Sequence, residues 1–157
     1  MLDEIDKLIL DELQKDARIT NTELARRINL SPPATLGRVK RLEENGYVQA
    51  YVALVNRKKA DFDMLCFVRV RLQLHDIDQV TGFHEAIREM PEVLECHHLT
   101  GEYDYLLKVV AHNTQGLEHF LVHRLTPIPG VAQIHTSLVL REVKNSTAIP
   151  LQSPSSI

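Results

Sequence analysis

Apolar residues recur every three or four positions in three stretches near the start of the chain, a spacing typical of helices that bury one face. The stretches cover about residues 2–15, 20–29 and 31–46. In the first stretch the apolar positions are Ile5, Leu8, Ile9 and Leu13. The pattern predicts three short amphipathic helices in this part of the chain.

Capping residues separate these predicted helices. Thr20 and Glu23 form a capping box, in which the Thr20 hydroxyl accepts the Glu23 backbone N–H and the Glu23 carboxylate returns to Thr20. Ser31 is a good N-cap and Pro32 a good first helical residue, since the missing N–H of proline would have no partner there. Gly46 ends the third helix. Two short helices so close together indicate a helix-turn-helix arrangement.

The third predicted helix has an apolar inner stripe and a basic outer face. The stripe consists of Leu36, Val39 and Leu42, and the outer positions at helical spacing are Ala34, Thr35, Arg38 and Arg41. A plain three-helix bundle explains the stripe but does not explain the basic face. This face favours DNA as the partner of the segment.

Charge along the chain supports this hypothesis. The 157 residues include 18 Lys and Arg against 21 Asp and Glu, a formal net charge of -3. Residues 18–41, however, hold six basic residues against Glu23 alone, a balance of +5. A basic segment on an acidic chain suggests a polyanionic partner, and a solvated helical face is the alternative.

Composition excludes several classes of protein. With 44% hydrophobic and 25% charged residues, the chain is typical of folded globular proteins. Two cysteines, Cys66 and Cys96, are too few for a disulfide framework. No apolar run reaches the roughly 18 residues of a membrane span, and the acidic first residues do not resemble a signal peptide. We expect a cytoplasmic protein with no membrane partner.

From residue 61 the pattern changes to alternating strands and amphipathic helices. Before it, residues 47–56 form a predicted extended segment, a connecting strand that serves either as a wing beside DNA or as a tether between domains. The predicted order is strand, helix, strand, strand, helix, strand, over residues 64–74, 78–90, 92–100, 105–111, 114–125 and 131–143. This order is that of a ferredoxin-like α+β sandwich. The expected domains are 1–60 and 61–150, followed by a loose tail at 151–157.

Three segments carry a family resemblance: Leu30-Ser31-Pro32 in the helix-turn-helix, the basic run 38–43, and the hairpin 101–107. Together, and in this order, they resemble the Lrp/AsnC family of bacterial and archaeal transcriptional regulators, over residues 2 to about 150. The resemblance implies a winged helix-turn-helix domain that binds double-stranded DNA, joined to a ferredoxin-like βαββαβ domain that senses a ligand. It also implies self-association as a dimer, and usually as an octamer built from four dimers.

DNA-contacting residues are expected on the second and third helices. We expect bases to be read by Pro33, Thr35 and Arg38, and phosphates to be held by Asn21, Thr22 and Arg41, with Ser31 and Ala34 completing the set. The family often carries a cysteine and then a bulky polar residue where this chain has Thr35 and Gly37. The operator sequence therefore stays undetermined.

The effector site is carried over from the family by position. The resemblance places an amino-acid effector between dimers, on the loop Thr100, Gly101, Glu102, Tyr103 and Asp104, with Thr136 and Ser137 as weaker candidates on the facing wall. Backbone N–H groups near Gly101 suit a carboxylate, and Glu102 or Asp104 suits an ammonium group. The alternative is an ordinary turn that Asp104 caps. We expect leucine or methionine, because the sequence places no cation to meet an acidic side chain.

Other chemistries have weaker support. Cys96, His97 and His98 are metal-ligand types, but neighbours on a strand point to opposite faces, so we expect no metal and no cofactor besides the effector. A siroheme-decarboxylase-like enzyme resembles the same two-domain plan, yet an enzyme has no need for a basic outer face on the third helix. An architectural protein of the nucleoid differs only in specificity. We expect a regulator and not an enzyme.

Overall fold

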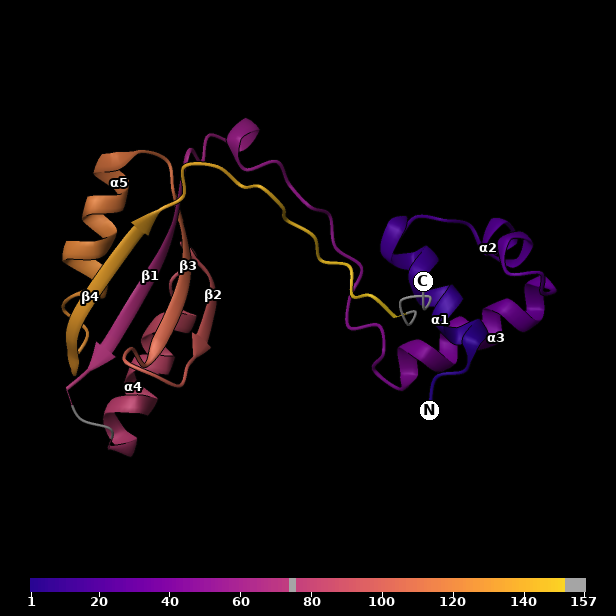
Figure 1. The fold of residues 1–157 in the computed structure, drawn as a ribbon, viewed down its shortest axis with the longest axis horizontal. Helices are drawn as coiled ribbons and strands as arrows, with labels where there is room; N and C mark the ends of the chain where they lie inside the picture. Colours follow the sequence, from indigo (N-terminus) through magenta and orange to yellow (C-terminus); the bar gives the residue numbers. More distant parts are fainter. Residues whose placement is uncertain (74–75, 152–157) are drawn as a thin grey trace, which may run out of the picture. The chain divides into compact units, whose positions relative to one another are not determined.

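Three helices lie in the N-terminal part of the chain, as the apolar spacing predicts: α1 (Glu4–Lys15), α2 (Asn21–Arg27) and α3 (Pro32–Glu44) (Figure 1). The computed structural model describes residues 1–73 and 76–151. One core joins the three helices, with Ile9, Leu24 and Leu42 almost completely buried in it. Each helix is therefore fixed by the apolar stripe that it presents to the other two.

The helix starts differ in part from the predicted capping. The Thr20 hydroxyl accepts the Glu23 N–H at 3.2 Å, which confirms half of the capping box. The prediction of the return bond to Thr20 is wrong, because the Glu23 carboxylate binds the guanidinium groups of Arg26 and Arg27 instead. Charged donors hold a carboxylate more strongly than a backbone amide does. A reciprocal box forms at α1, between Asp3 and Asp6.

The segment 47–56 belongs to no sheet in the described part of the chain. The prediction of a connecting strand over these residues is therefore wrong for a single chain. A strand needs a hydrogen-bonded neighbour, and no other segment of the described chain pairs with this one.

The second half of the chain forms a four-stranded antiparallel sheet in the order β2-β3-β1-β4. Its elements follow the predicted sequence: β1 (Met64–Leu72), α4 (Ile77–Arg88), β2 (Val93–His98), β3 (Tyr105–Ala111), α5 (Thr114–His119) and β4 (Val131–Leu138). The predicted strand over 64–74 includes Leu74, which lies outside the described residues. The predicted helix over 114–125 continues after α5 as a π-helix over Phe120–Leu125.

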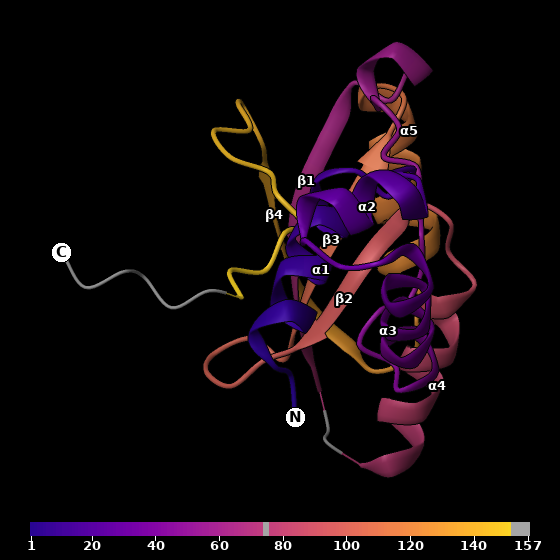
Figure 2. The same cartoon turned by 90° about the vertical axis from the view of Figure 1, so that its right-hand side faces the viewer.

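Both α4 and α5 cover the same face of this sheet (Figure 2). Side chains of β1 alternate accordingly: Cys66, Val68 and Val70 are fully buried in the core beneath the helices, while Arg69 between them is exposed. The second face of the sheet carries no helix of residues 55–73 and 76–143. We call this second face the open face of the sheet.

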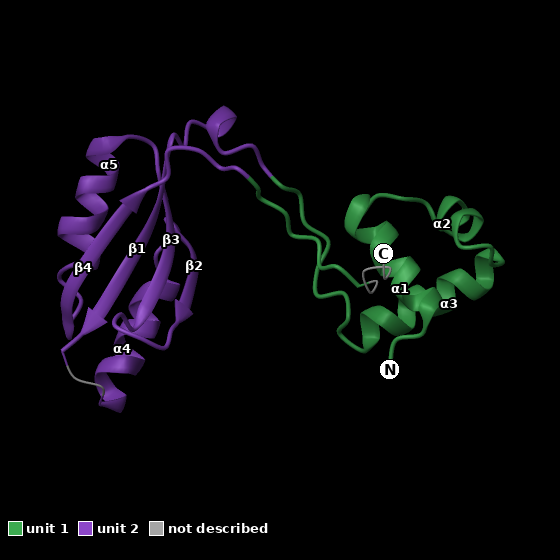
Figure 3. Ribbon diagram, viewed as in Figure 1, with its two compact units in different colours: residues 1–54, 144–157 green, residues 55–143 purple. Residues whose placement is uncertain are grey.

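The chain passes between its two compact units twice (Figure 3). Unit 1 consists of residues 1–54 and the segment from Lys144 onward, and unit 2 of Val55–Val143. The predicted boundaries lay at residues 60 and 150, and the return of the chain to unit 1 was not predicted. Of the predicted loose tail over 151–157, residues 152–157 lie outside the described residues. The returning segment groups with unit 1 because Leu151 packs against the core of the three helices. No helix among the described residues is both long and apolar enough to span a membrane.

Candidate functional site

The buried face of α3 is rotated relative to the predicted one. Thr35 is fully buried and its hydroxyl donates to the Ser31 carbonyl at 3.0 Å, whereas Leu36 is 57% exposed. Each helical residue advances by about 100°, so Leu36 lies roughly 120° from Leu42, while Thr35 lies within about 20° of it. The prediction that Thr35 faces DNA is wrong. The backbone bond to Ser31 satisfies the hydroxyl and allows it to be buried.

The exposed surface of α3 is formed by its first turn and by the side opposite Thr35. Ser31 caps the helix by accepting the Ala34 N–H, and Pro33, Ala34 and Gly37 are all exposed. Lys40 is 72% exposed, with its ammonium nitrogen 3.9 Å from a Glu44 oxygen. We call Ser31, Pro33, Ala34, Gly37 and Lys40 the α3 surface.

Helix α2 supports the start of this surface. The Asn21 side-chain amide donates to the Pro32 carbonyl at 2.9 Å, so α2 is tied directly to the first turn of α3. Thr22 beside it is exposed. Asn21 therefore has a structural bond in addition to its predicted phosphate contact.

The guanidinium groups of Arg38 and Arg41 converge on α1 of the same unit. Nη1 of Arg38 donates to Asp3 at 2.6 Å and to Asp6 at 2.8 Å, and Nη2 of Arg41 donates to both oxygens of Asp6 at 2.8 Å. Asp6 is only 2% exposed. A buried carboxylate is stable only when charged or hydrogen-bonding partners compensate its lost hydration, and these two arginines do so. This pairing, which we call the Asp6 clamp, was missed in the sequence because it joins residues far apart in the chain.

The loop after β2 is fastened to β1. The Asp104 N–H donates to the Val70 carbonyl at 2.9 Å, and the Asp104 carboxylate accepts the Leu72 N–H at 2.7 Å. Gly101 adopts a φ of +114°, a conformation that side-chain-bearing residues rarely take. Glu102 is exposed. Asp104 and Gly101 thus shape the turn, as expected for an ordinary turn that Asp104 caps. The loop still presents Thr100, Glu102 and backbone groups outward.

Two arginines of β1 lie beside this loop on the open face of the sheet. The Arg69 and Arg71 guanidinium carbons are 5.4 and 5.9 Å from the centre of the Tyr103 ring, and Arg71 donates to the Glu102 carbonyl at 3.0 Å. The expectation that no cation lies near the effector loop is wrong. The register that brings β1 under the loop cannot be read from the sequence.

Thr136 and Ser137 lie further along the sheet than the loop. They pair with Val68 and Phe67, whereas the loop is attached at Val70 and Leu72. Within one chain, the β4 residue that approaches the loop is His135, whose ring lies 6.4 Å from that of Tyr103. A role for Thr136 and Ser137 therefore needs a second chain.

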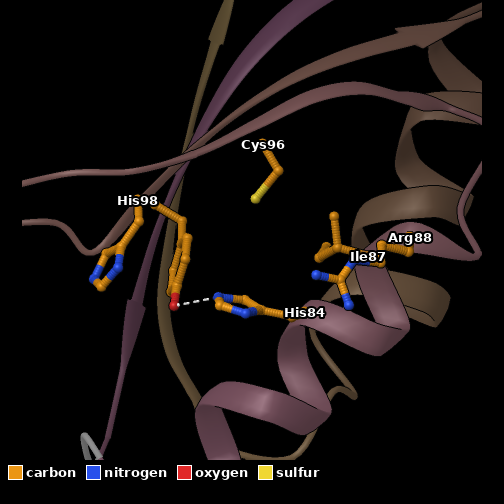
Figure 4. A pocket seen from close by; sticks show the side chains of 6 residues that line it. His84, Ile87, Arg88, Cys96 and His98 are labelled. Atoms are coloured by element: carbon orange, nitrogen blue, oxygen red, sulfur yellow. Dashed lines mark hydrogen bonds between the residues drawn. The ribbon is translucent and has the colours of Figure 1, made fainter.

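A cavity of about 260 Å³ lies on the other face, between α4 and the β2–β3 hairpin (Figure 4). Its lining consists of His84, Ile87, Arg88, Cys96, His98 and Tyr105. His84 Nε2 and the Tyr105 hydroxyl are 2.8 Å apart, and the His98 ring stacks on that of Tyr105. Cys96 is exposed, and partial desolvation raises the pKa of its thiol, so the thiol stays protonated at neutral pH.

This hairpin cavity adjoins the predicted effector loop, because His98 and Tyr105 are the paired residues at its base. The alternation of side chains along a strand predicts Cys96 and His98 on one face, but the packing of α4 against them has no signal in the sequence. No three metal-ligand side chains gather anywhere in residues 1–73 and 76–151. The lining suits a small ligand with an apolar part, for which Arg88 provides a cation at the rim.

Family patterns match both units. A pattern described as winged helix-turn-helix DNA-binding covers residues 2–49, and the Lrp/AsnC ligand binding domain covers residues 65–149. The leucine-responsive regulatory proteins of Escherichia coli K12 and Klebsiella pneumoniae are each 40% identical to the chain over 152 residues. The match spans 97% of this chain and 93% of either relative.

Solved structures show the same architecture. A transcriptional regulator of Neisseria meningitidis, crystallised with L-methionine, superposes with a TM-score of 0.93 at 38% identity, over 96% of this chain and 97% of the other. Escherichia coli AsnC superposes with a TM-score of 0.88 at 25% identity, over 96% and 99% of the two chains. These likenesses extend over both units.

The rotation of α3 leads to a prediction that distinguishes residues that contact DNA from residues that stabilise the fold. Lys40→Ala should weaken binding to every DNA duplex, because it removes a charge from the α3 surface without removing a buried contact. Thr35→Ala should lower the free energy of unfolding by about 1 kcal/mol, since it removes a buried hydrogen bond and a methyl group. Fluorescence anisotropy and thermal melts measure the two effects. Unchanged stability in Thr35→Ala, or unchanged affinity in Lys40→Ala, would contradict this placement.

Acid should weaken the contact between α1 and α3. The hydrogen bond from Arg38 holds the pKa of the Asp3 carboxyl below its usual value. A lowered pKa in the folded state stabilises the fold above the ordinary pKa, and this contribution disappears as the pH falls through the folded-state value. The melting-temperature difference between wild type and Asp3→Asn should therefore shrink as the pH falls from neutrality through the ordinary Asp value of 3.8 and below it. A difference that stays constant over this range would show that the Asp3–Arg38 pair has no effect on stability.

Proposed function

The chain belongs to the Lrp/AsnC family of transcriptional regulators, and from this premise we propose how its own residues bind DNA and an effector. The observation that carries the proposal is the joining of two patterns in one chain, a winged helix-turn-helix over residues 2–49 and a ligand-binding domain over residues 65–149. Unit 1 binds operator DNA, and an amino acid bound by unit 2 changes that binding or the assembly of the protein.

DNA binds the α3 surface, with Pro33 and Ala34 against bases and Lys40 against a phosphate. The exposed first turn and the missing side chain of Gly37 let the backbone approach the major groove closely. Asn21, Thr22 and Ser31 flank this surface and contact the DNA backbone. Arg38 and Arg41 contribute chiefly by holding α3 against α1, because their guanidinium groups already bind Asp3 and Asp6.

The effector is a small apolar amino acid. Its carboxylate and ammonium groups bind Thr100, Gly101 and Glu102 of the loop, and its side chain enters the hairpin cavity. The cavity volume of about 260 Å³ is just below the range of about 300–1,000 Å³ found for drug-sized ligands, which suits a single amino acid. Relatives named leucine-responsive and a similar regulator crystallised with L-methionine support leucine or methionine.

The protein assembles through unit 2, first as a dimer and then as an octamer. The open face of the sheet lacks a cover in the described chain, and Val52, Leu54 and Val55 before it are 70–76% exposed. Apolar residues exposed side by side favour association with a second copy. A second copy also brings Thr136 and Ser137 to the effector. Because it binds DNA, the protein acts in the bacterial or archaeal cytoplasm, at the nucleoid.

Regulation is favoured over the two other functions. The similar proteins are named as leucine-responsive regulatory proteins and as a transcriptional regulator, which gives the decarboxylase-like alternative no support. An architectural role would bind all duplexes equally, so it differs from our proposal in a measurable way. Sequence selection from a random duplex pool distinguishes these two.

A thermal-shift screen with the twenty amino acids tests the effector site. An apolar amino acid should raise the melting temperature of the wild type, because a ligand that binds only the folded state stabilises it. Gly101→Trp should abolish this shift by blocking the loop, and Cys96→Trp by filling the cavity. His97→Trp is the matched control, since its side chain lies on the opposite face of the same strand.

Each outcome of this screen has one meaning. If no amino acid stabilises the wild type, the effector belongs to another chemical class. If the shift persists in Gly101→Trp, the loop assignment is wrong, and if it persists in Cys96→Trp, the cavity assignment is wrong. Light scattering of the same samples shows whether the ligand changes assembly.

A further inference from the structure

The segment that follows β4 contacts α1 through residues 149 and 151. The Gln14 side-chain amide pairs with the backbone of Ile149, accepting its N–H at 2.6 Å and donating to its carbonyl at 3.1 Å. Leu151 is partly buried against the core of the three helices. A paired amide and a buried leucine together form a specific attachment of the chain's C-terminal segment to the DNA-binding unit.

At unit 2 the two connections between the units are fastened to each other. Arg57 on the first connection forms an ion pair with Glu142 on the second, with 3.2 Å between nitrogen and oxygen. Nη1 of Arg57 also donates to the Phe62 carbonyl at 2.8 Å. The Val139 N–H donates to the Leu65 carbonyl at 2.8 Å, so the second connection leaves β4 along β1.

At unit 1 the first connection has attachments of its own. Val48 packs against the helical core, and the Tyr51 hydroxyl donates to the Glu43 carboxylate at 2.7 Å. Burial and this carboxylate together raise the pKa of Tyr51 to about 12, so the donor keeps its proton at neutral pH. Both connections are therefore anchored at each end, and the stretches between their anchors are 52–56 and 143–148.

We propose that residues 143–151 act as a second strut, which docks on Gln14 of α1 and limits the movement of the DNA-binding unit relative to the sensor unit. A DNA-binding unit that is held by one flexible connection moves through a large volume; we call this unit the reader below. A second connection that closes a loop reduces this volume and raises the effective concentration of the reader at its DNA site. The strut begins at the end of β4, the strand that carries His135 beside the effector loop.

The consequence concerns binding by two readers, and it rests on the proposed dimeric function. In a dimer, once the first reader has bound its half-site, the second reader binds the other half-site intramolecularly, at a rate set by its effective concentration there. Releasing the strut lowers that concentration without changing the α3 surface. Affinity for a duplex with two half-sites should fall, whereas affinity for a single half-site should not.

The test uses the full-length chain and a duplex selected in vitro with the wild type. One probe carries the whole duplex, and a second probe has one half scrambled. Gln14→Ala removes both bonds to Ile149, and Leu151→Asp removes the buried anchor. Val143→Asp is the matched control, since it places the same charge on the same segment at a residue that is 91% exposed.

We expect Gln14→Ala and Leu151→Asp to weaken binding to the whole duplex by about threefold to tenfold, to leave the half-scrambled probe unchanged, and to speed hydrogen exchange in α1. Val143→Asp should match the wild type on both probes. Wild-type binding that is equal on both probes would overturn the proposed two-reader function and the strut with it. A wild-type preference that both variants retain would overturn the strut alone.

Discussion

A carboxylate removed from water must find positive partners, and in unit 1 the carboxylate of Asp6 finds them in Arg38 and Arg41 of α3. The contact fixes the rotation of α3 about its own axis, because two successive turns of that helix must reach the same group. With α3 rotated in this way, Thr35 lies inside and the exposed first turn faces outward. The orientation of the α3 surface thus depends on this buried charge as well as on the apolar stripe.

Unit 2 follows a different constraint. Its sheet is covered by α4 and α5 on one face only, so these helices leave the other face open (Figure 2). The loop is held to β1 by Asp104, while Arg69 and Arg71 surround Tyr103 and the hairpin cavity opens on the opposite side. The β2–β3 loop and β1 therefore place cations and carboxylates beside Tyr103, and the same hairpin lines an apolar hollow on the opposite face.

The sequence predicted the order of helices and strands because each follows from local periodicity and capping. It failed where a contact joins distant segments. Leu36 and Thr35 exchanged faces because a three-residue spacing drifts around a helix, and because a hydroxyl can be buried once it donates to the preceding turn. The Asp6 clamp, the arginines beside Tyr103 and the return of Leu151 to α1 all depend on tertiary placement, which no local pattern contains.

The most direct test of this account is a double-mutant cycle between Asp6 and Arg38, with the free energy of unfolding and the base preference of selected DNA as readouts. The account predicts that Asp6→Asn and Arg38→Gln are coupled by about 0.5–3 kcal/mol in stability. It also predicts that Arg38→Gln binds DNA more weakly while preferring the same bases as the wild type. Additive effects on stability, together with a changed preference at one operator position, would show instead that Arg38 reads a base directly.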